Sequence, residues 1–145
     1  MKYKLIIDKN AEEEVTVIAH APSALTEKIE ALVNGDASAD FIMGYRNDEM
    51  CKLPFEKIEC ITVLDRRVLA IDENGDRFFV KERLRDLEGV LPPYFVRINK
   101  STIANELRIA RFGAAFSGGV DAYFYCGYRD YVSRRCFAEI RRRYE

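Results

Sequence analysis

Three short polar turns hold the side chains of this sequence that are best suited to recognition chemistry. They are Asp65-Arg66-Arg67, Arg97-Ile98-Asn99-Lys100-Ser101 and Ser133-Arg134-Arg135. Arginine suits guanine, asparagine suits adenine, and serine hydroxyls or backbone N–H groups suit phosphate oxygens. The three turns could therefore bind duplex DNA if the fold brought them to one edge. Each turn alone is equally typical of a solvated surface, and the pattern by itself does not place them together.

Residue patterns typical of catalysis are absent from the sequence. No nucleophile lies in a recognisable elbow, and no pair of carboxylates has an apolar setting that would separate two pKa values. Ser117-Gly118-Gly119 could mimic a phosphate-binding loop, but the Gly-Lys-Ser/Thr of a Walker motif is missing, so this segment is predicted to be a hairpin turn. We therefore predict that the protein is not an enzyme and needs no cofactor.

The cysteines and the histidine do not form a metal-binding pattern. The four cysteines are widely and irregularly spaced: Cys51, Cys60, Cys126 and Cys136. A zinc site needs close pairs of ligands, and His20 is the only histidine. We predict no metal site and four reduced thiols. The alternative is redox sensing, for which Cys51 and Cys136 are the candidates because Lys52 and Arg135 lie beside them.

An aromatic segment offers a second route to nucleic acid. Tyr123-Phe124-Tyr125, with Tyr128 and Tyr131 nearby, could stack on the bases of a single strand. Successive residues of a strand face opposite sides of the sheet, so at most two of these rings could share an exposed surface. Cross-strand packing is therefore the favoured interpretation.

Composition limits the class of protein without naming a partner. The 145 residues, 48% of them apolar, suffice for one domain, or for a domain of about 100 residues with an appendage. No apolar run approaches a membrane span or a signal peptide, so we expect a cytoplasmic protein. Residues 1–53 hold 6 Lys/Arg against 10 Asp/Glu, a net charge of −4, whereas residues 54–145 hold 17 against 14, a net charge of +3. This basic excess is too weak to predict nucleic-acid binding on its own.

The elements that must position the turns begin with a segment predicted as β-β-α-β-β. Ser23 is the expected N-cap of its helix, and Asn34-Gly35 is the expected end. The four strands are predicted over Lys2–Ile7, Val15–His20, Phe41–Tyr45 and Met50–Leu53, the last two as a hairpin.

From residue 54 onward, short strands and tight turns predict a mostly-β (α+β) fold of antiparallel sheets. Asn74-Gly75 is the strongest hairpin signal. Helices are predicted over Lys81–Gly89 and Ser133–Tyr144, with Ser133 as an N-cap. The predicted strands are Ile58–Leu64, Val68–Ile71, Phe78–Val80, Tyr94–Val96, Leu107–Phe112, Ala114–Ser117, Val120–Gly127 and Tyr128–Val132.

Several segments of this second part match the motifs of one family in order. Phe55–Ile61 matches an opening strand motif "dI-x-yIe", Asn74-Gly75 a hairpin, and Leu84–Glu88 a helix motif "sL-x-x-Le". Tyr94–Asn105 matches "F-x-R-x-H-r-S-x-x-v-N", and Tyr131–Arg135 matches "v-S-R-r" before the last helix. On these segments the chain, from about Leu53 to Tyr144, resembles a LytTR domain. The resemblance implies an elongated antiparallel multi-sheet fold whose loops enter successive major grooves of DNA, commonly at direct repeats, and bend it.

The resemblance also implies roles for individual residues by matching position. Base- or groove-contacting positions of the family fall on Arg66, Lys100 and Arg135. Ser101 and Ser133 fall at positions that contact phosphate or hold the loops, and Asn99 replaces the usual histidine but could still donate a hydrogen bond. The full set of expected DNA-binding residues is Arg66, Arg67, Arg97, Asn99, Lys100, Ser101, Ser133, Arg134 and Arg135.

We therefore predict an N-terminal β/α extension over residues 1–52 and a LytTR-like DNA-binding domain over residues 53–145. The extension is similar to the small β-α-β unit of stand-alone LytTR proteins of Gram-positive bacteria, whose genes often neighbour a small membrane protein. That likeness implies dimerisation or contact with a regulator. The predicted protein is a transcription regulator that binds double-stranded DNA as a homodimer, with a small membrane regulatory protein as a further partner. The alternative is a protein-interaction module, for example for a membrane-bound inhibitor, with weak or lost DNA binding.

Overall fold

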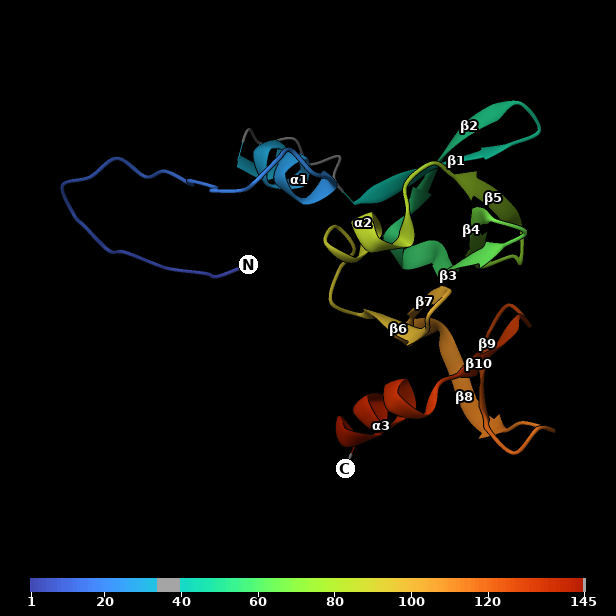
Figure 1. Ribbon diagram of the computed structural model, residues 1–145. Helices are drawn as coiled ribbons and strands as arrows, with labels where there is room; N and C mark the ends of the chain where they lie inside the picture. Colours follow the sequence, from blue (N-terminus) through green and yellow to red (C-terminus); the bar gives the residue numbers. More distant parts are fainter. Residues whose placement is uncertain (34–39, 145) are drawn as a thin grey trace.

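The computed structural model describes residues 1–33 and 40–144, and Figure 1 shows two sheets with short helices around them. The larger sheet has the strand order β2-β1-β5-β4-β3-β7-β6, and the smaller has the order β10-β9-β8. All strand pairs are antiparallel, as the sequence predicts. The strands are β1 (Phe41–Arg46), β2 (Glu49–Pro54), β3 (Ile58–Leu64), β4 (Arg67–Asp72), β5 (Arg77–Val80), β6 (Phe95–Asn99), β7 (Thr102–Asn105), β8 (Ile109–Ala114), β9 (Val120–Phe124) and β10 (Arg129–Val132). The helices are α1 (Ala24–Val33), α2 (Leu84–Glu88) and α3 (Arg134–Arg142), with 3₁₀ turns η1 (Phe55–Lys57) and η2 (Glu106–Arg108).

Two apolar cores lie on opposite faces of β3. Ile61 belongs to the core beneath α2, and Cys60 belongs to the core between the two sheets and α3. β3 is therefore buried on both faces from Ile58 to Thr62, and its sequence does not alternate between buried and exposed positions there. Ile140 anchors α3 in the second core, and burial of a side chain of this size stabilises the fold by about 1.5–3 kcal/mol.

The tight turns follow the local sequence. Gly75 adopts φ 81° and its N–H donates to the Asp72 carbonyl, so the predicted Asn74-Gly75 hairpin is confirmed. The β3–β4 turn consists of Asp65 and Arg66, with φ values of 50° and 64° between the paired residues that end β3 and start β4. Two left-handed residues are typical of the type I′ turn, whose twist suits antiparallel neighbours. Arginine is an unusual residue in this conformation, so Arg66 is held there by the turn and not by its own preference.

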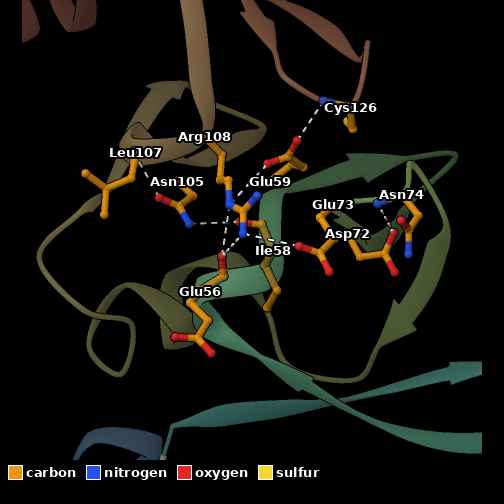
Figure 2. Close-up of polar contacts among 10 residues, drawn as sticks. All are labelled: Glu56, Ile58, Glu59, Asp72, Glu73, Asn74, Asn105, Leu107, Arg108 and Cys126. Carbon is orange, nitrogen blue, oxygen red and sulfur yellow. Dashed lines mark hydrogen bonds and ion pairs between the residues drawn. The ribbon is translucent and has the colours of Figure 1, made fainter.

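A buried polar cluster joins the two sheets (Figure 2). Glu59 on β3 is fully buried, and its Oε1 accepts a hydrogen bond of 2.8 Å from the backbone N–H of Cys126, which follows β9. Arg108, just before β8, donates from Nε (3.0 Å) and Nη2 (2.7 Å) to the carbonyl of Glu56. Its Nε lies 3.8 Å from Oε2 of Glu59, and its Nη2 lies 3.3 Å from Oε2 of Glu73. These contacts fix the small sheet against β3 and the β4–β5 turn.

The charge state of Glu59 is affected by this setting. Burial raises the pKa of its carboxyl, while the Cys126 N–H and the Arg108 guanidinium act in the opposite direction. Oε2 of Glu59 has no hydrogen-bond partner within the described residues. Asn105 adds a second link at this junction, because its Nδ2 donates to the carbonyl of Ile58 (3.0 Å) and its Oδ1 accepts from the N–H of Leu107 (3.0 Å).

The first two predicted strands are wrong. Residues 2–7 and 15–20 form no strand, and Figure 1 shows this segment as an extended arm that leads away from the sheets. Ile6 and Ile18 are 72% and 94% exposed. The runs have the composition of strands, but a strand needs a paired neighbour, and the described chain supplies none for the arm.

The predicted helix after the arm is confirmed as α1. Ser23 caps it, since its Oγ accepts from the N–H of Thr26 at 3.2 Å. The expected end at Asn34-Gly35 lies outside the described residues. Lys28 connects α1 to the rest of the protein because its Nζ donates to the Val90 carbonyl and lies 4.8 Å from the centre of the Phe55 ring. Burial lowers the pKa of Lys28.

Other element boundaries differ from those predicted. Residues 115–119 are a turn rather than the end of a strand over Ala114–Ser117, and Leu107 lies in η2. β9 stops at Phe124 because Gly127, with φ 95°, completes a tight turn there.

The predicted hairpin over residues 41–53 is confirmed, and β1 pairs with β5 through Tyr45 and Phe79, so this hairpin belongs to the seven-stranded sheet. None of the described helices is long and apolar enough to cross a membrane.

Candidate nucleic-acid interface

The fold brings the three predicted turns together. The β6–β7 turn, Lys100-Ser101, is bonded to the end of β3, because the Val63 N–H donates to the Ser101 carbonyl at 2.9 Å. The β3–β4 turn begins two residues after Val63. On the other side, the Ser133 N–H, at the start of α3, donates to the Ile98 carbonyl at 2.8 Å. The central turn therefore lies between the other two.

A hollow of about 540 Å³ separates the β6–β7 turn from the start of α3. We call it the central hollow. Three cations, Arg97, Lys100 and Arg135, line it together with one carboxylate, Glu88. The remaining lining residues are Asn99, Tyr131, Ser133 and Cys136. Its charge suits an anionic partner, and five of its eight lining residues belong to two of the predicted turns.

Asn99 has a positioning role in this structure. The side chain is 2% exposed. Its Nδ2 donates to the Tyr131 carbonyl at 2.8 Å, and its Oδ1 accepts from the Ser101 N–H at 2.8 Å. The amide thus ties the β6–β7 turn to β10, and the burial argues against the expectation that it donates to DNA.

Arg97 is used in a similar way. Its Nη1 donates to the Lys100 carbonyl at 2.7 Å, and its Nε forms an ion pair with Glu88. The guanidinium therefore supports the turn from the side of α2. Lys100 lies at the tip, exposed, and makes no side-chain ion pair with any described residue.

A chain of buried hydroxyls connects the strands behind the turns. The Thr62 and Thr102 hydroxyls lie 2.7 Å apart, and Thr102 Oγ1 donates to Oδ2 of Asp130 at 2.6 Å. Because a hydroxyl has one proton, Thr102 gives its proton to Asp130 and accepts that of Thr62. Oδ1 of Asp130 accepts from the Tyr131 N–H at 2.8 Å. This chain joins β3, β7 and β10, each close to one of the three turns, and the sequence reasoning missed it.

The two arginines of the β3–β4 turn are in different situations. Arg66 is exposed and has no ion-pair partner within residues 1–33 and 40–144. The guanidinium of Arg67 lies 5.2 Å from the centre of the Phe79 ring on β5, a cation–π contact. Arg67 therefore packs on its own sheet, whereas Arg66 projects from the tip of the turn.

The start of α3 presents two further cations. Ser133 is confirmed as the N-cap, since its Oγ accepts from the Cys136 N–H at 3.2 Å. Arg134 and Arg135 form the exposed first turn of α3. In the part of the chain that the structure describes, neither makes an ion pair.

The aromatic segment packs against protein. Phe124 is 3% exposed and contacts Tyr128 with ring centres 6.0 Å apart. The ring of Tyr123 lies under Arg111, whose guanidinium is 3.7 Å from the ring centre. The prediction of cross-strand packing is confirmed for these two rings, whereas Tyr125 and Tyr131 are exposed, at 69% and 49%.

The cysteines are all free thiols. Cys60 and Cys136 are buried, while Cys51 and Cys126 are half-buried. Burial raises the pKa of the Cys60 and Cys126 thiols, which favours their unreactive protonated form. Among the described residues, no group of three or more His, Cys, Asp and Glu side chains could hold a metal ion.

Comparison with known proteins adds three findings. A family model described as the LytTr DNA-binding domain matches residues 48–145. HTH-type transcriptional regulators from two Staphylococcus aureus strains, NCTC 8325 and COL, are 30% identical over 146 residues, covering 99% of this chain and 97% of theirs. The solved structure of a LytTr DNA-binding domain from Bacillus cereus is similar with a TM-score of 0.65 and 21% identity, covering 71% of this chain and 94% of that one.

Proposed function

Because the chain belongs to the LytTR family of DNA-binding domains, we propose that it is a transcription regulator that reads specific sequences of double-stranded DNA and is not an enzyme. One observation supports this most directly. Three turns that are distant in sequence meet along one edge, and each presents an exposed cation at its tip: Arg66, Lys100 and Arg135. The major groove of B-DNA is about 12 Å wide and admits an α-helix or a two-stranded β-ribbon.

The contacts described above divide the predicted residues into two groups. Arg66, Lys100 and Arg135 are the proposed base-reading residues, because their side chains are exposed and unpaired among the described residues. Arg134, Ser101 and Ser133 lie beside them and are the proposed phosphate-contacting set. Arg67, Arg97 and Asn99 have partners within the protein, so we assign them the positioning of the turns.

The proposed mode of binding places the three turns in successive major grooves. The weak basic excess of residues 54–145 predicts modest affinity for one protomer, since phosphate contacts supply much of the affinity for DNA. A homodimer on repeated half-sites would double the contacts. We therefore propose a dimer, with half-sites about one helical turn apart.

Residues 1–33 are the proposed site of protein contacts. The arm and α1 expose many large apolar side chains, among them Tyr3, Ile7, Ile18 and Leu32. A second copy of the chain or a small membrane regulatory protein would cover such a surface. If DNA binding proved to be weak or lost, this region would carry the alternative function, that of a protein-interaction module.

The test is selection of bound duplexes from a random library with the full chain. We expect an enriched motif present twice at a spacing of about one helical turn. On that duplex, Arg135→Ala should weaken binding by about 5- to 150-fold, the equivalent of roughly 1–3 kcal/mol, and should hardly affect random duplexes. Failure of the wild-type chain to shift any duplex at low salt would refute DNA binding and favour the protein-interaction alternative.

A further inference from the structure

A second hollow, of about 400 Å³, lies on the other side of the start of α3. We call it the α3 hollow. Gly118 and Gly119 of the β8–β9 turn form one part of its wall, and Arg134 and Arg142 of α3 form another part. Phe137 and Val132 contribute to its lining as well. The β8–β9 turn is not one of the three turns that were predicted to bind DNA.

Strand register places this turn beside the proposed DNA-binding edge. Val120 pairs with Val132 at the end of the small sheet and with Ala114 across the turn. Because Gly119 precedes Val120, and Val132 precedes Ser133, this pairing places Gly119 close to the start of α3. Arg134 lines the α3 hollow and Arg135 lines the central hollow, so the two hollows are adjacent at the first turn of α3.

The chemistry of the α3 hollow suits a phosphate group. Arg134 and Arg142 are exposed and have no ion-pair partner among the described residues. The backbone N–H of Gly119 has no partner there either, whereas the Gly118 N–H donates to the Ala115 carbonyl. Guanidinium groups and free backbone N–H groups are the usual donors to DNA phosphates.

The glycines leave this wall open to close approach. A Cβ atom added to Gly119 would meet no protein atom within 4 Å. Gly118 has φ 89°, which requires glycine for the turn itself, but Gly119 has no such requirement. The space in front of Gly119 is therefore available to a ligand that approaches the backbone.

We infer that the α3 hollow holds a backbone phosphate of the bound duplex, and that the β8–β9 turn is a fourth point of contact with DNA. The inference rests on the proposed function, because it extends the same edge by one turn. A phosphate contact carries no sequence information, so this site adds affinity and orientation rather than specificity.

The experiment compares three variants of the full chain on the selected duplex and on a random duplex. Arg142→Gln removes a guanidinium, and Gly119→Ala adds a methyl group to the Cα beside the free N–H, in the open space of the hollow. Lys57→Gln is the matched control for charge, because Lys57 is exposed and lies at the opposite end of β3 from the β3–β4 turn. Thermal unfolding should be unchanged for all three.

We expect Arg142→Gln to weaken binding to both duplexes by the same factor, about tenfold, and to reduce the slope of log K against log salt by about one. Gly119→Ala should weaken both by a similar factor, and Lys57→Gln should match the wild type. If the wild type binds DNA and both test variants bind like Lys57→Gln, the α3 hollow is not a phosphate site. Loss confined to the selected duplex would likewise overturn the inference, and absence of wild-type binding to any duplex would refute the proposed function itself.

Discussion

The β6–β7 turn and the β3–β4 turn each present one exposed cation, but they are held in different ways. Asn99 and Arg97 fasten the β6–β7 turn to β10 and to α2 through side-chain contacts. The β3–β4 turn is formed by the backbone of Asp65 and Arg66 in left-handed conformations. The position of Lys100 therefore depends on contacts with Tyr131 and Glu88, which lie outside the turn, whereas that of Arg66 depends on two residues of the turn itself.

The largest effect should come from removing the support of the β6–β7 turn. Asn99→Ala leaves the Ser101 N–H and the Tyr131 carbonyl without their partner, which should lower the free energy of unfolding by about 2–3 kcal/mol. Urea denaturation measures this change. Specific DNA binding should fall as well, because the turn that carries Lys100 loses its tie to β10.

Lys100→Ala is the matched variant for this prediction. Lys100 is exposed, so its loss should change the unfolding free energy by less than about 0.5 kcal/mol while it still weakens specific binding. Equal stabilities of Asn99→Ala and Lys100→Ala would show that the amide does not hold the turn, and the contrast between the two turns would disappear.

The next effect concerns the hydroxyl chain behind the turns. Thr102→Val keeps the shape of the side chain but removes the donor to Oδ2 of Asp130 and the acceptor of the Thr62 hydroxyl, which should cost about 1–2 kcal/mol of unfolding free energy. The double variant Thr62→Val/Thr102→Val should cost less than the sum of the single changes, because the two hydroxyls share one hydrogen bond. Additive costs in chemical denaturation would mean that the chain is not coupled.

In the β3–β4 turn, by contrast, a substitution should weaken DNA binding while it hardly changes the unfolding free energy. Arg66→Gly places a glycine at φ 64°, where it is not strained, so the unfolding free energy should stay within about 1 kcal/mol of the wild-type value. Specific DNA binding should nevertheless weaken, by roughly 1–3 kcal/mol if Arg66 reads a base. Asp65→Gly is the control, since it makes the same backbone change at φ 50° and keeps Arg66. An equal loss of binding in both variants would assign the effect to the backbone of the turn.

The same contrast explains which parts of the structure could be predicted from the sequence. The Asn74-Gly75 hairpin and the Ser133 cap are local, and both are confirmed. The burial of Asn99 and the pairing of Thr62 with Thr102 depend on strand register between residues up to 40 positions apart, which composition does not encode.

The arm shows the converse error. Its β-rich runs, residues 2–7 and 15–20, satisfy local preference, but they find no neighbouring strand within the described chain. Local preference predicted an element where tertiary pairing was required. Residue types alone singled out the three turns, but the choice of one base-reading residue in each came from the family motif, because an exposed arginine in a turn has no distinctive pattern of its own.

The smallest effect is expected at the junction of the two sheets. This junction supports β10, and through β10 the β6–β7 turn, but it does not support the β3–β4 turn directly. The folded state raises the pKa of Glu59 above its ordinary value of about 4.5, so the folded protein binds this proton more tightly than the unfolded chain. Its contribution to stability is then greatest below that value and declines as pH rises through the interval up to the raised pKa. The groups that face Glu59 are Arg108, Glu73, Cys60 and Cys126.

Glu59→Gln isolates this contribution, because the variant keeps an oxygen that can accept from the Cys126 N–H and loses the titrating proton. The difference in unfolding free energy between variant and wild type should shift in favour of the variant as pH rises from about 4.5 to 7. Glu73→Gln, at the rim of the same cluster, controls for the loss of a neighbouring charge. Parallel stability curves for wild type and Glu59→Gln would show that Arg108 and the Cys126 N–H fully offset burial. The junction would then hold β10, and with it the β6–β7 turn, equally at every pH in this range.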